Sequence, residues 1–361
     1  MKRKGKFRRL LITGGSGFIG SNYVRYVLAE HPDINVVNLD ALTYAGNPEN
    51  LRDIENDPRY TFVRGSITDR ELVDSLVADV DAIVNIAAES HVDRSIFDAD
   101  PFVETNIRGT QILLDAAVAH GKKRFHQVST DEVFGSLGPN DPPFTETTPY
   151  APRNPYSASK AGADHLVLAY HNTHGLPVTI SHCSNNYGPY QFPEKLIPLF
   201  IDNLRAGKTA PVHGNGAQIR DLIHVRDHCA GIDACLHRGQ AGERYVFGDD
   251  NEMTVLELAK LLITLLGASE SQIEFVKDRP GNDRRYATDS SKAKRELGWQ
   301  TQFSFEEGLR MTIDWYLAHQ DWVERCQSGA YRADCEADYL AKRHALTRLD
   351  SRLVDASRMT A

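Results

Sequence analysis

The sequence predicts an α/β fold built on a doubly wound parallel sheet, followed by a smaller, mixed α/β domain. Two observations indicate this class. A strand pattern, a glycine-rich turn and a helical pattern follow one another near the N-terminus, and strand and helix patterns continue to alternate as far as residue 129. Ligands of such sheets bind beyond the carboxyl ends of the strands, so the residues that follow each strand are the functional candidates.

The glycine-rich turn lies between the strand pattern 9–13 and the helical pattern 21–29. It reads Gly14-Gly15-Ser16-Gly17-Phe18-Ile19-Gly20, which fits both GxGxxG and GxxGxxG. Either spacing places bare N–H groups and a helix N-terminus where a pyrophosphate can bind. A tight turn without a ligand is the alternative for this motif alone.

Asp40 strengthens the interpretation of that turn as a dinucleotide site. It ends the second strand pattern, 35–39, and follows Gly20 by twenty residues. A carboxylate there can accept hydrogen bonds from both hydroxyl groups of an adenosine ribose, and it repels a 2′-phosphate. Because no Arg follows within 41–46, the sequence predicts a Rossmann-type unit that binds NAD rather than NADP.

The remaining patterns define the domain organisation. Strands are expected at 60–63, 82–86 and 125–129, and helices at 69–78 and 101–120. We expect an NAD-binding Rossmann domain with the catalytic residues over 8–185, an interleaved domain that mainly binds the substrate over 186–325, and a charged helical tail over 326–361. The second domain is expected to contain strands at 245–247 and 273–275 and helices at 254–266 and 305–319.

Composition weighs against several classes of protein. The 361 residues carry 41 basic and 49 acidic side chains, and this net charge of −8 argues against a nucleic-acid partner. No apolar run approaches the roughly 18 residues that a membrane-spanning helix needs. Five cysteines without a CxxC spacing favour reduced thiols over disulfides or a metal site. The N-terminus shows no signal-peptide cleavage site, so we expect a cytoplasmic protein that acts on a small molecule.

Candidate catalytic residues follow the strand pattern 125–129. Thr130, Asp131 and Glu132 come directly after it, and adjacent carboxyl groups in different surroundings can serve as acid and base. Tyr156 and Lys160 are four residues apart on a predicted helix and therefore share a face. A nearby ammonium group favours the phenolate, which lets a tyrosine act as a base. A solvated turn and an amphipathic coincidence are the alternatives.

The segment 13–20, together with Tyr156 and Lys160, resembles the extended short-chain dehydrogenase/reductase family. Within it, longer segments are similar to dTDP-glucose 4,6-dehydratases: 42–47, 87–95, 129–133, 183–195 and 278–281. The resemblance covers roughly residues 8 to 325.

This resemblance implies a redox-neutral lyase reaction on a nucleotide-linked hexose. Tyr156, assisted by Lys160, would take the C4 hydroxyl proton while a hydride passes from C4 to NAD⁺, and Thr130 would hydrogen-bond the C4 oxygen. Glu132 would then remove the C5 proton while Asp131, kept protonated, delivers a proton to the departing C6 hydroxyl. The hydride finally returns to C6, which gives the 4-keto-6-deoxy sugar of deoxysugar synthesis.

The resemblance also implies two sets of binding residues and a homodimer formed by the helices near 104–119 and 157–173. The cofactor set comprises Gly14, Gly17, Phe18, Ile19, Gly20, Asp40, Thr43, Ser66, Ile67, Ala87, Ala88, Ser90 and Thr105, with Tyr156 and Lys160. The substrate set comprises Ser90, Thr130, Asn185, Glu194, Lys195, Pro211, His213, Arg220, Asn251 and Asn282. An exposed charge is the alternative for Glu194, and His91 is interpreted as a structural residue rather than a metal ligand.

Several positions depart from the family pattern. Ser66 replaces an acid that usually reads the adenine amine, and Asn85 replaces a His. On the substrate side, His213 replaces an aromatic Tyr, Leu222 a Trp and Asn282 a His. The nucleotide base and the sugar therefore stay open. A UDP-sugar dehydratase, or a 4-epimerase or decarboxylase of the same superfamily, is the alternative enzyme, and a non-catalytic NAD-binding module is the alternative outside enzymes.

Overall fold

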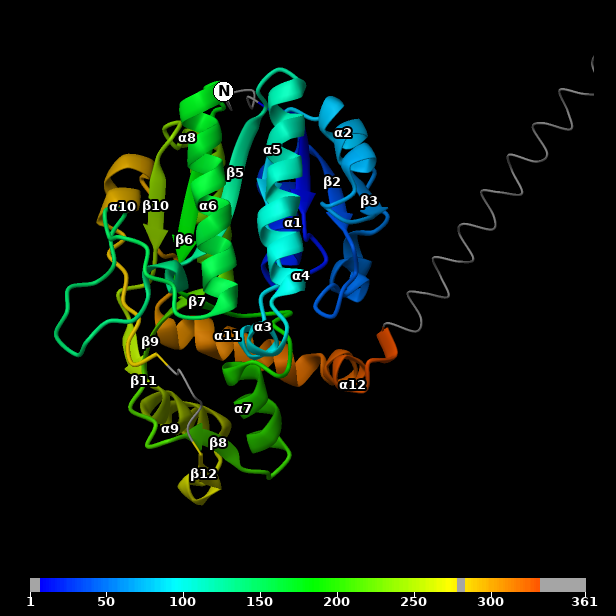
Figure 1. Ribbon diagram of the computed structural model, residues 1–361. Helices are drawn as coiled ribbons and strands as arrows, with labels where there is room; N and C mark the ends of the chain where they lie inside the picture. The colour runs from blue at the N-terminus through cyan, green and yellow to red at the C-terminus, as the bar shows by residue number, and fades with distance from the viewer. Residues whose placement is uncertain (1–6, 278–282, 332–361) are drawn as a thin grey trace, which may run out of the picture.

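The structure, a computed structural model, describes residues 7–277 and 283–331. Its centre is a seven-stranded sheet in the order β10-β6-β5-β4-β1-β2-β3, in which every pair of neighbouring strands is parallel (Figure 1). These strands are β1 (Arg9–Thr13), β2 (Asn35–Asp40), β3 (Tyr60–Arg64), β4 (Ala82–Asn85), β5 (Arg124–Thr130), β6 (Val178–Cys183) and β10 (Arg244–Phe247). The strand order reverses between β1 and β4, which confirms the doubly wound prediction.

Helices cover both faces of this sheet. The helices of the Rossmann part are α1 (Phe18–Glu30), α2 (Arg70–Ala78), α3 (Val92–Phe97), α4 (Asp100–Phe102), α5 (Thr110–Ala119), α6 (Pro155–His174) and α8 (Val225–Arg238). Because side chains alternate along a strand, Leu10 and Ile12 pack with α1 and α8, whereas Leu11 packs with α2, α5 and α6. Figure 1 shows α5 and α6 over the near face. Two apolar layers thus hold the strand ends in fixed positions.

The helix expected over 101–120 is interrupted in the structure. Between α4 and α5, Val103–Gly109 forms a π-helical turn. The side chain of Asn106 there accepts a hydrogen bond from the Glu89 N–H at 2.9 Å and donates to the Glu89 carbonyl at 3.0 Å. It also donates to Ser159 Oγ at 2.8 Å. The turn therefore ties the loop after β4 to α6. Helical periodicity in the sequence does not predict the turn, because it depends on these tertiary contacts.

The second part of the molecule packs around its own apolar cluster at the carboxyl end of the main sheet (Figure 1). It holds β7 (Asn185–Tyr187), β8 (Ala210–His213), β9 (Ile219–His224), β11 (Glu252–Thr254) and β12 (Ile273–Val276). Its helices are α7 (Leu196–Arg205), α9 (Val255–Leu266), α11 (Phe305–Ala318) and α12 (Gln320–Ser328), whereas α10 (Ser291–Leu297) packs with β10 and α8 of the Rossmann part. The strands form two small sheets, β11-β9-β7 and β12-β8. A mixed α/β architecture was expected for this part.

The strand expected at 245–247 forms, but its place in the second domain was wrong. As β10 it pairs in parallel with β6 and completes the edge of the main sheet. Tyr245 and Phe247 pack with Trp299 in the cluster beneath α8 and α10. The chain thus returns to the Rossmann part after entering the second one. Of the tail predicted over 326–361, the part beyond residue 331 lies outside the described residues.

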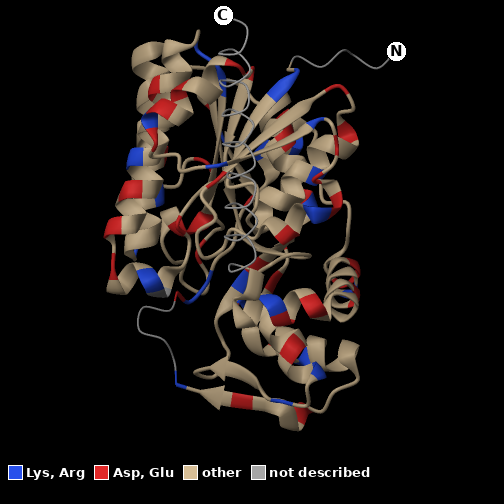
Figure 2. Ribbon diagram, turned by 90° about the vertical axis from the view of Figure 1, so that its right-hand side faces the viewer, with Lys and Arg blue, Asp and Glu red and all other residues tan. Residues whose placement is uncertain are grey.

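The described residues also bear on the composition arguments. None of the helices found in 7–277 and 283–331 is long and apolar enough to span a membrane. Cys183, Cys229, Cys235 and Cys326 are buried free thiols, as expected. Acidic and basic residues are interspersed over both parts in the view of Figure 2. Charge is therefore not gathered on one face in this view.

Asn106→Ala should lower the free energy of unfolding by about 2 kcal/mol, because it leaves the partly buried Glu89 backbone groups without their side-chain partner. Urea unfolding followed by circular dichroism measures this change. Gln111→Ala, on the partly exposed face of α5, is the matched control and should change stability by under about 0.5 kcal/mol. Equal effects of the two substitutions would contradict the role given to the π-helical turn.

Candidate active site

The glycine-rich turn brings α1 unusually close to the sheet. A Cβ on Gly20 would lie 2.0 Å from the Gly14 carbonyl oxygen, and one on Gly14 would lie 2.7 Å from the Ala87 Cα. Gly14 also has a positive φ of 69°. Gly17 is the N-cap of α1 and makes no side-chain cap, so the first N–H groups of this helix are available to an anion.

A cavity of about 370 Å³ opens in front of this turn. Its lining includes every residue predicted for the cofactor, from Gly14 at the turn to Thr105 in the π-helical segment, with Tyr156 and Lys160 at the far end. A second cavity of about 310 Å³ adjoins it and shares Asn185, Glu194 and Lys195. Pro211, His213 and Arg220 line the second cavity. The two sets of predicted residues thus meet in one continuous depression.

Asp40 holds the turn and faces the first cavity. Its Oδ2 accepts a hydrogen bond from the Ser16 N–H at 2.9 Å, and its Oδ1 accepts one from the Leu42 N–H at 2.8 Å. Burial raises the pKa of this carboxyl, and the two backbone donors oppose the rise. Ser66 lies in the same lining and accepts a hydrogen bond from the Thr68 N–H at 3.1 Å. Both residues therefore line the same cavity, next to the glycine-rich turn.

Tyr156 and Lys160 lie on one face of α6, as expected from their spacing. Lys160 Nζ donates to the Val128 carbonyl oxygen at 2.7 Å, which fixes the ammonium beside the end of β5. Burial lowers the pKa of Lys160, and Asp164 opposes that change. Burial and the negative charge of Glu132 raise the pKa of Tyr156 well above its ordinary value. Positive charge beside the ring would lower this pKa.

Asp131 and Glu132 begin a short 3₁₀ helix, Asp131–Phe134, directly after β5. Asp131 is fully buried, and its Oδ2 has no hydrogen-bond partner, while Oδ1 accepts from Thr130 Oγ1 at 3.3 Å. Burial, then Glu132 and Asp221, raise its pKa well above the ordinary value. A neutral, protonated Asp131 is the form that these surroundings favour.

Glu132 lines the cavity and has different electrostatic surroundings. Burial raises its pKa, but the positive charges of Lys195 and Arg220 lower it. Its backbone N–H donates to Thr130 Oγ1 at 3.3 Å. Both carboxyls thus have raised pKa values, that of Asp131 well above its ordinary value, and two cations oppose the rise at Glu132.

The substrate-side residues are held by contacts within the second part and by one contact with His91 of the Rossmann part. The Arg220 guanidinium lies 4.8 Å from the centroid of the Tyr286 ring and donates to the Asp283 carbonyl at 3.0 Å. His213 Nδ1 lies 3.0 Å from the Lys277 carbonyl oxygen. Glu194 pairs with His91 at 3.1 Å and lines both cavities. Glu194 therefore makes a contact at the cavities and is not only an exposed charge.

Two predicted substrate residues are not placed in these cavities. Asn251 lines neither of them; its backbone N–H donates instead to the buried Asp221 carboxyl. Asn282 and the similar segment 278–281 lie outside the described residues.

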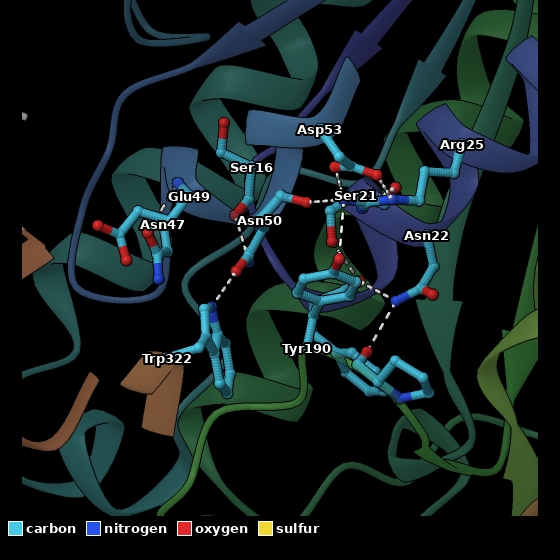
Figure 3. Close-up of polar contacts among 12 residues, drawn as sticks. Ser16, Ser21, Asn22, Arg25, Asn47, Glu49, Asn50, Asp53, Tyr190 and Trp322 are labelled. Atoms are coloured by element: carbon cyan, nitrogen blue, oxygen red, sulfur yellow. Dashed lines mark hydrogen bonds and ion pairs between the residues drawn. The ribbon is translucent and has the colours of Figure 1, made fainter. Parts of the chain in front are cut away.

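The C-terminal helix contributes residues that the sequence did not reveal. Trp322, on α12, lines the first cavity and donates from Nε1 to Asn50 Oδ1 at 2.9 Å (Figure 3). Asn50 in turn donates to the Ser16 carbonyl oxygen in the glycine-rich turn at 3.0 Å. A residue more than 300 positions away thus supports the turn. A lone Trp in a charged C-terminal stretch gives no local signal of such a contact.

Tyr190 joins the same corner of the site, also missed by the sequence. It has a positive φ of 67°, and its ring packs against Trp322 at 6.0 Å between centroids. Arg25, on α1, lies 4.3 Å from the ring centroid and donates to the Tyr190 hydroxyl at 3.0 Å (Figure 3). The second part is thereby fastened to α1. A non-glycine residue with a positive φ is uncommon, and the sequence does not predict one at this position.

Comparison with protein families gives one match that covers most of the chain. Residues 11–312 match the family model described as GDP-mannose 4,6 dehydratase. The chain belongs to this family.

Individual relatives are similar over nearly their whole length. The chain is 54% identical to the low-salt glycan biosynthesis protein Agl12 of Haloferax volcanii, over 86% of this chain and 99% of that one. It is 49% identical to a dTDP-glucose 4,6-dehydratase of Xanthomonas campestris, over 90% and 97%. The structure of DesIV, a dTDP-glucose 4,6-dehydratase from Streptomyces venezuelae solved with NAD bound, superposes with a TM-score of 0.85 at 51% identity, over 88% and 99%.

The pKa of Asp221 makes stability depend on pH. Burial raises this pKa to about 6 from an ordinary value of 3.8. Protonated Asp221 therefore contributes fully to the stability of the wild type below about pH 4, and this contribution is lost as pH rises through 6. The side chain of Asp221→Asn cannot ionise. The free energy of unfolding of this variant, minus that of the wild type, should therefore increase by about 2–3 kcal/mol from pH 4 to pH 8.

Urea unfolding at several pH values measures this difference. Asp289→Asn is the control with the opposite sign, because hydrogen bonds from Ser291 lower the pKa of Asp289. The free energy of unfolding of that variant, relative to the wild type, should decrease as pH rises. A pH-independent difference for Asp221→Asn would contradict the shifted pKa.

Proposed function

We propose that this protein is an NAD-dependent lyase that removes water across C5 and C6 of a nucleotide-diphospho-hexose, converting dTDP-glucose to dTDP-4-keto-6-deoxyglucose. The observation that carries the proposal is the single cavity that joins the dinucleotide turn, Tyr156 and Glu132, with Asp131 buried beside them. The Xanthomonas and Streptomyces relatives, both named as dTDP-glucose 4,6-dehydratases, support the choice of substrate.

The residues around the glycine-rich turn fit an NAD molecule. The close contact of Gly14 with Ala87 leaves room only for bare backbone, and the open N-terminus of α1 suits a pyrophosphate. Asp40 would receive the adenosine ribose, with Thr43, Ser66 and Ile67 nearby in the lining. When bound, NAD⁺ supplies positive charge beside Tyr156, a hydride acceptor and, once reduced, a hydride donor.

Tyr156 would start the reaction by taking the proton of the C4 hydroxyl, and the cofactor would supply the acceptor for the C4 hydride, so that C4 becomes a ketone. Lys160, held by the Val128 carbonyl, provides the positive charge that stabilises the phenolate. Thr130, in the cavity lining, would donate to the C4 oxygen. Asn185, Lys195 and Arg220 would hold the sugar and its diphosphate, and Arg220 suits an anion because its donors form a planar fork.

Glu132 and Asp131 carry the elimination. The C4 ketone acidifies the C5 proton, which Glu132 removes as general base. Asp131 gives its proton to the C6 hydroxyl as the C6–O bond breaks, and water leaves. Once C6 has received its hydride, Glu132 returns the proton to C5. The raised pKa of Asp131 and the cations beside Glu132 support this division of roles.

The proposal includes a homodimer that works in the cytoplasm. Helices α5 and α6 would form its interface. Val103, at the start of the π-helical turn that leads into α5, is 51% exposed, and Phe97, on α3, is 90% exposed. Large apolar side chains left in water favour a second copy of the chain as a partner.

Mass spectrometry of the nucleotide-linked product tests the proposed activity. Purified protein with NAD⁺ should convert dTDP-glucose to a product lighter by one water, faster than it converts UDP-glucose or UDP-N-acetylglucosamine. Loss of water from a UDP-sugar alone would make it a UDP-sugar dehydratase. Unchanged mass with an inverted C4 would make it an epimerase, loss of carbon dioxide from a UDP-uronic acid would make it a decarboxylase, and tight NAD binding without any product would make it a binding module.

Two substitutions separate oxidation from elimination. Tyr156→Phe should lower turnover by at least about 10³-fold without forming reduced cofactor, because no base remains for the C4 hydroxyl. Glu132→Gln should still oxidise C4 and then stall, so that absorbance at the wavelength of enzyme-bound NADH rises after a single addition of substrate. An unchanged dehydration rate in Glu132→Gln would contradict the assignment of the base.

A further inference from the structure

Two histidines and an aspartate converge on the face of the main sheet that α1 and α8 cover. His31 directly follows α1, and Asp233 and His237 lie four residues apart on α8, so they share a face. His31 Nε2 lies 2.8 Å and His237 Nε2 lies 3.4 Å from one oxygen, Asp233 Oδ1. The three ligand atoms all lie within 4.8 Å of one another.

We propose that His31, Asp233 and His237 bind a divalent transition metal of the zinc type. Two imidazole nitrogens and one carboxylate oxygen are ligands that Zn²⁺ takes in proteins. A tetrahedral ion with bonds of roughly 2.0–2.2 Å holds its ligand atoms roughly 3.4 Å apart. The separation of 3.4 Å between His237 Nε2 and Asp233 Oδ1 matches that value, and the 2.8 Å between His31 Nε2 and Asp233 Oδ1 is shorter, so the His31 ring must move away from Asp233 to complete the geometry. Water occupies the fourth position.

His237 supplies an independent observation that points to a ligand. Its Nε2 is buried and makes no hydrogen bond, although Asp233 Oδ1 is only 3.4 Å away. A buried nitrogen without a partner costs free energy, and a metal ion bound between it and the carboxylate removes that cost. The ring is held in place by His31, at 4.8 Å between centroids, and by Phe7, at 5.4 Å.

The site is accessible and separate from the proposed chemistry. The side chain of His31 is 26% exposed, which gives an ion a path from solvent. The 13 residues of α1 place His31 roughly 20 Å from the glycine-rich turn at the other end of the helix. A bound metal would therefore clamp α1 to α8 and act on stability rather than on turnover. The proposal does not depend on the proposed function.

Zinc binding to untagged, chelator-treated protein tests the site, with a chromophoric chelator as competitor for Zn²⁺. The wild type should bind one Zn²⁺ per chain, and its melting temperature should rise on binding. His31→Gln and Asp233→Asn should each weaken binding at least tenfold and abolish the rise. If Asp233→Asn fails to fold, the result for His31→Gln, at the partly exposed end of α1, decides the test.

His120→Gln is the matched control, because His120 Nε2 also contacts a carboxylate, Asp74 Oδ1, at 2.9 Å but in a pair rather than a trio. Its zinc affinity should equal that of the wild type. A crystal soaked in Zn²⁺ should show anomalous density between α1 and α8. Absence of binding at micromolar Zn²⁺, unchanged affinity in His31→Gln, or anomalous density elsewhere would each overturn the proposal.

Discussion

The hydroxyl of Thr13 locks together the carboxyl ends of the two strands between which the cavity opens. Its Oγ1 donates to Asn85 Oδ1 at 2.6 Å and accepts from the N–H groups of Ile86 and Ala87 at 3.2 Å each. Because β1 and β4 diverge in their connections at this point, the loop after β4 is fixed by this contact together with the Asn106 side chain. Fixing it beside Gly14 sets the width of the dinucleotide cleft and the starting point of α1. The contact thus fixes where the loop after β4, with Ala87, meets the glycine-rich turn.

Local sequence was sufficient wherever the functional feature depends on neighbouring residues. The turn at Gly14 to Gly20, the acid at Asp40 and the Tyr156–Lys160 pair are each set by a spacing within one strand–turn–helix unit or one helix, and the structure places all of them in one cavity. Periodicity likewise found the strand that became β10. It did not find the partner strand, because pairing with β6 depends on contacts some 65 residues apart in sequence.

The features that escaped prediction depend on long-range contacts. Asn106 needs the π-helical turn only because it bonds the Glu89 backbone and Ser159 at once. Trp322 reaches the glycine-rich turn through Asn50, across 272 positions of sequence. Nothing in the helical pattern of either segment differs from that of an ordinary surface helix. Such contacts are specified by the packed core, so they become visible only once the fold is assembled.

The expected departures from the family pattern differ, between the two parts of the molecule, in how strongly a substitution at that position affects stability. Asn85 lies inside the sheet at a position where the resemblance predicts a His, and its side chain accepts from Thr13 and donates to Thr110 and Gln127. A change at such a buried position must keep several hydrogen bonds at once. His213 is half-buried at the second cavity, and among the described residues its Nδ1 contacts the Lys277 carbonyl. A residue there can change with little loss of stability, so substrate preference can shift while the sheet that positions Thr130, Asp131 and Glu132 keeps its geometry.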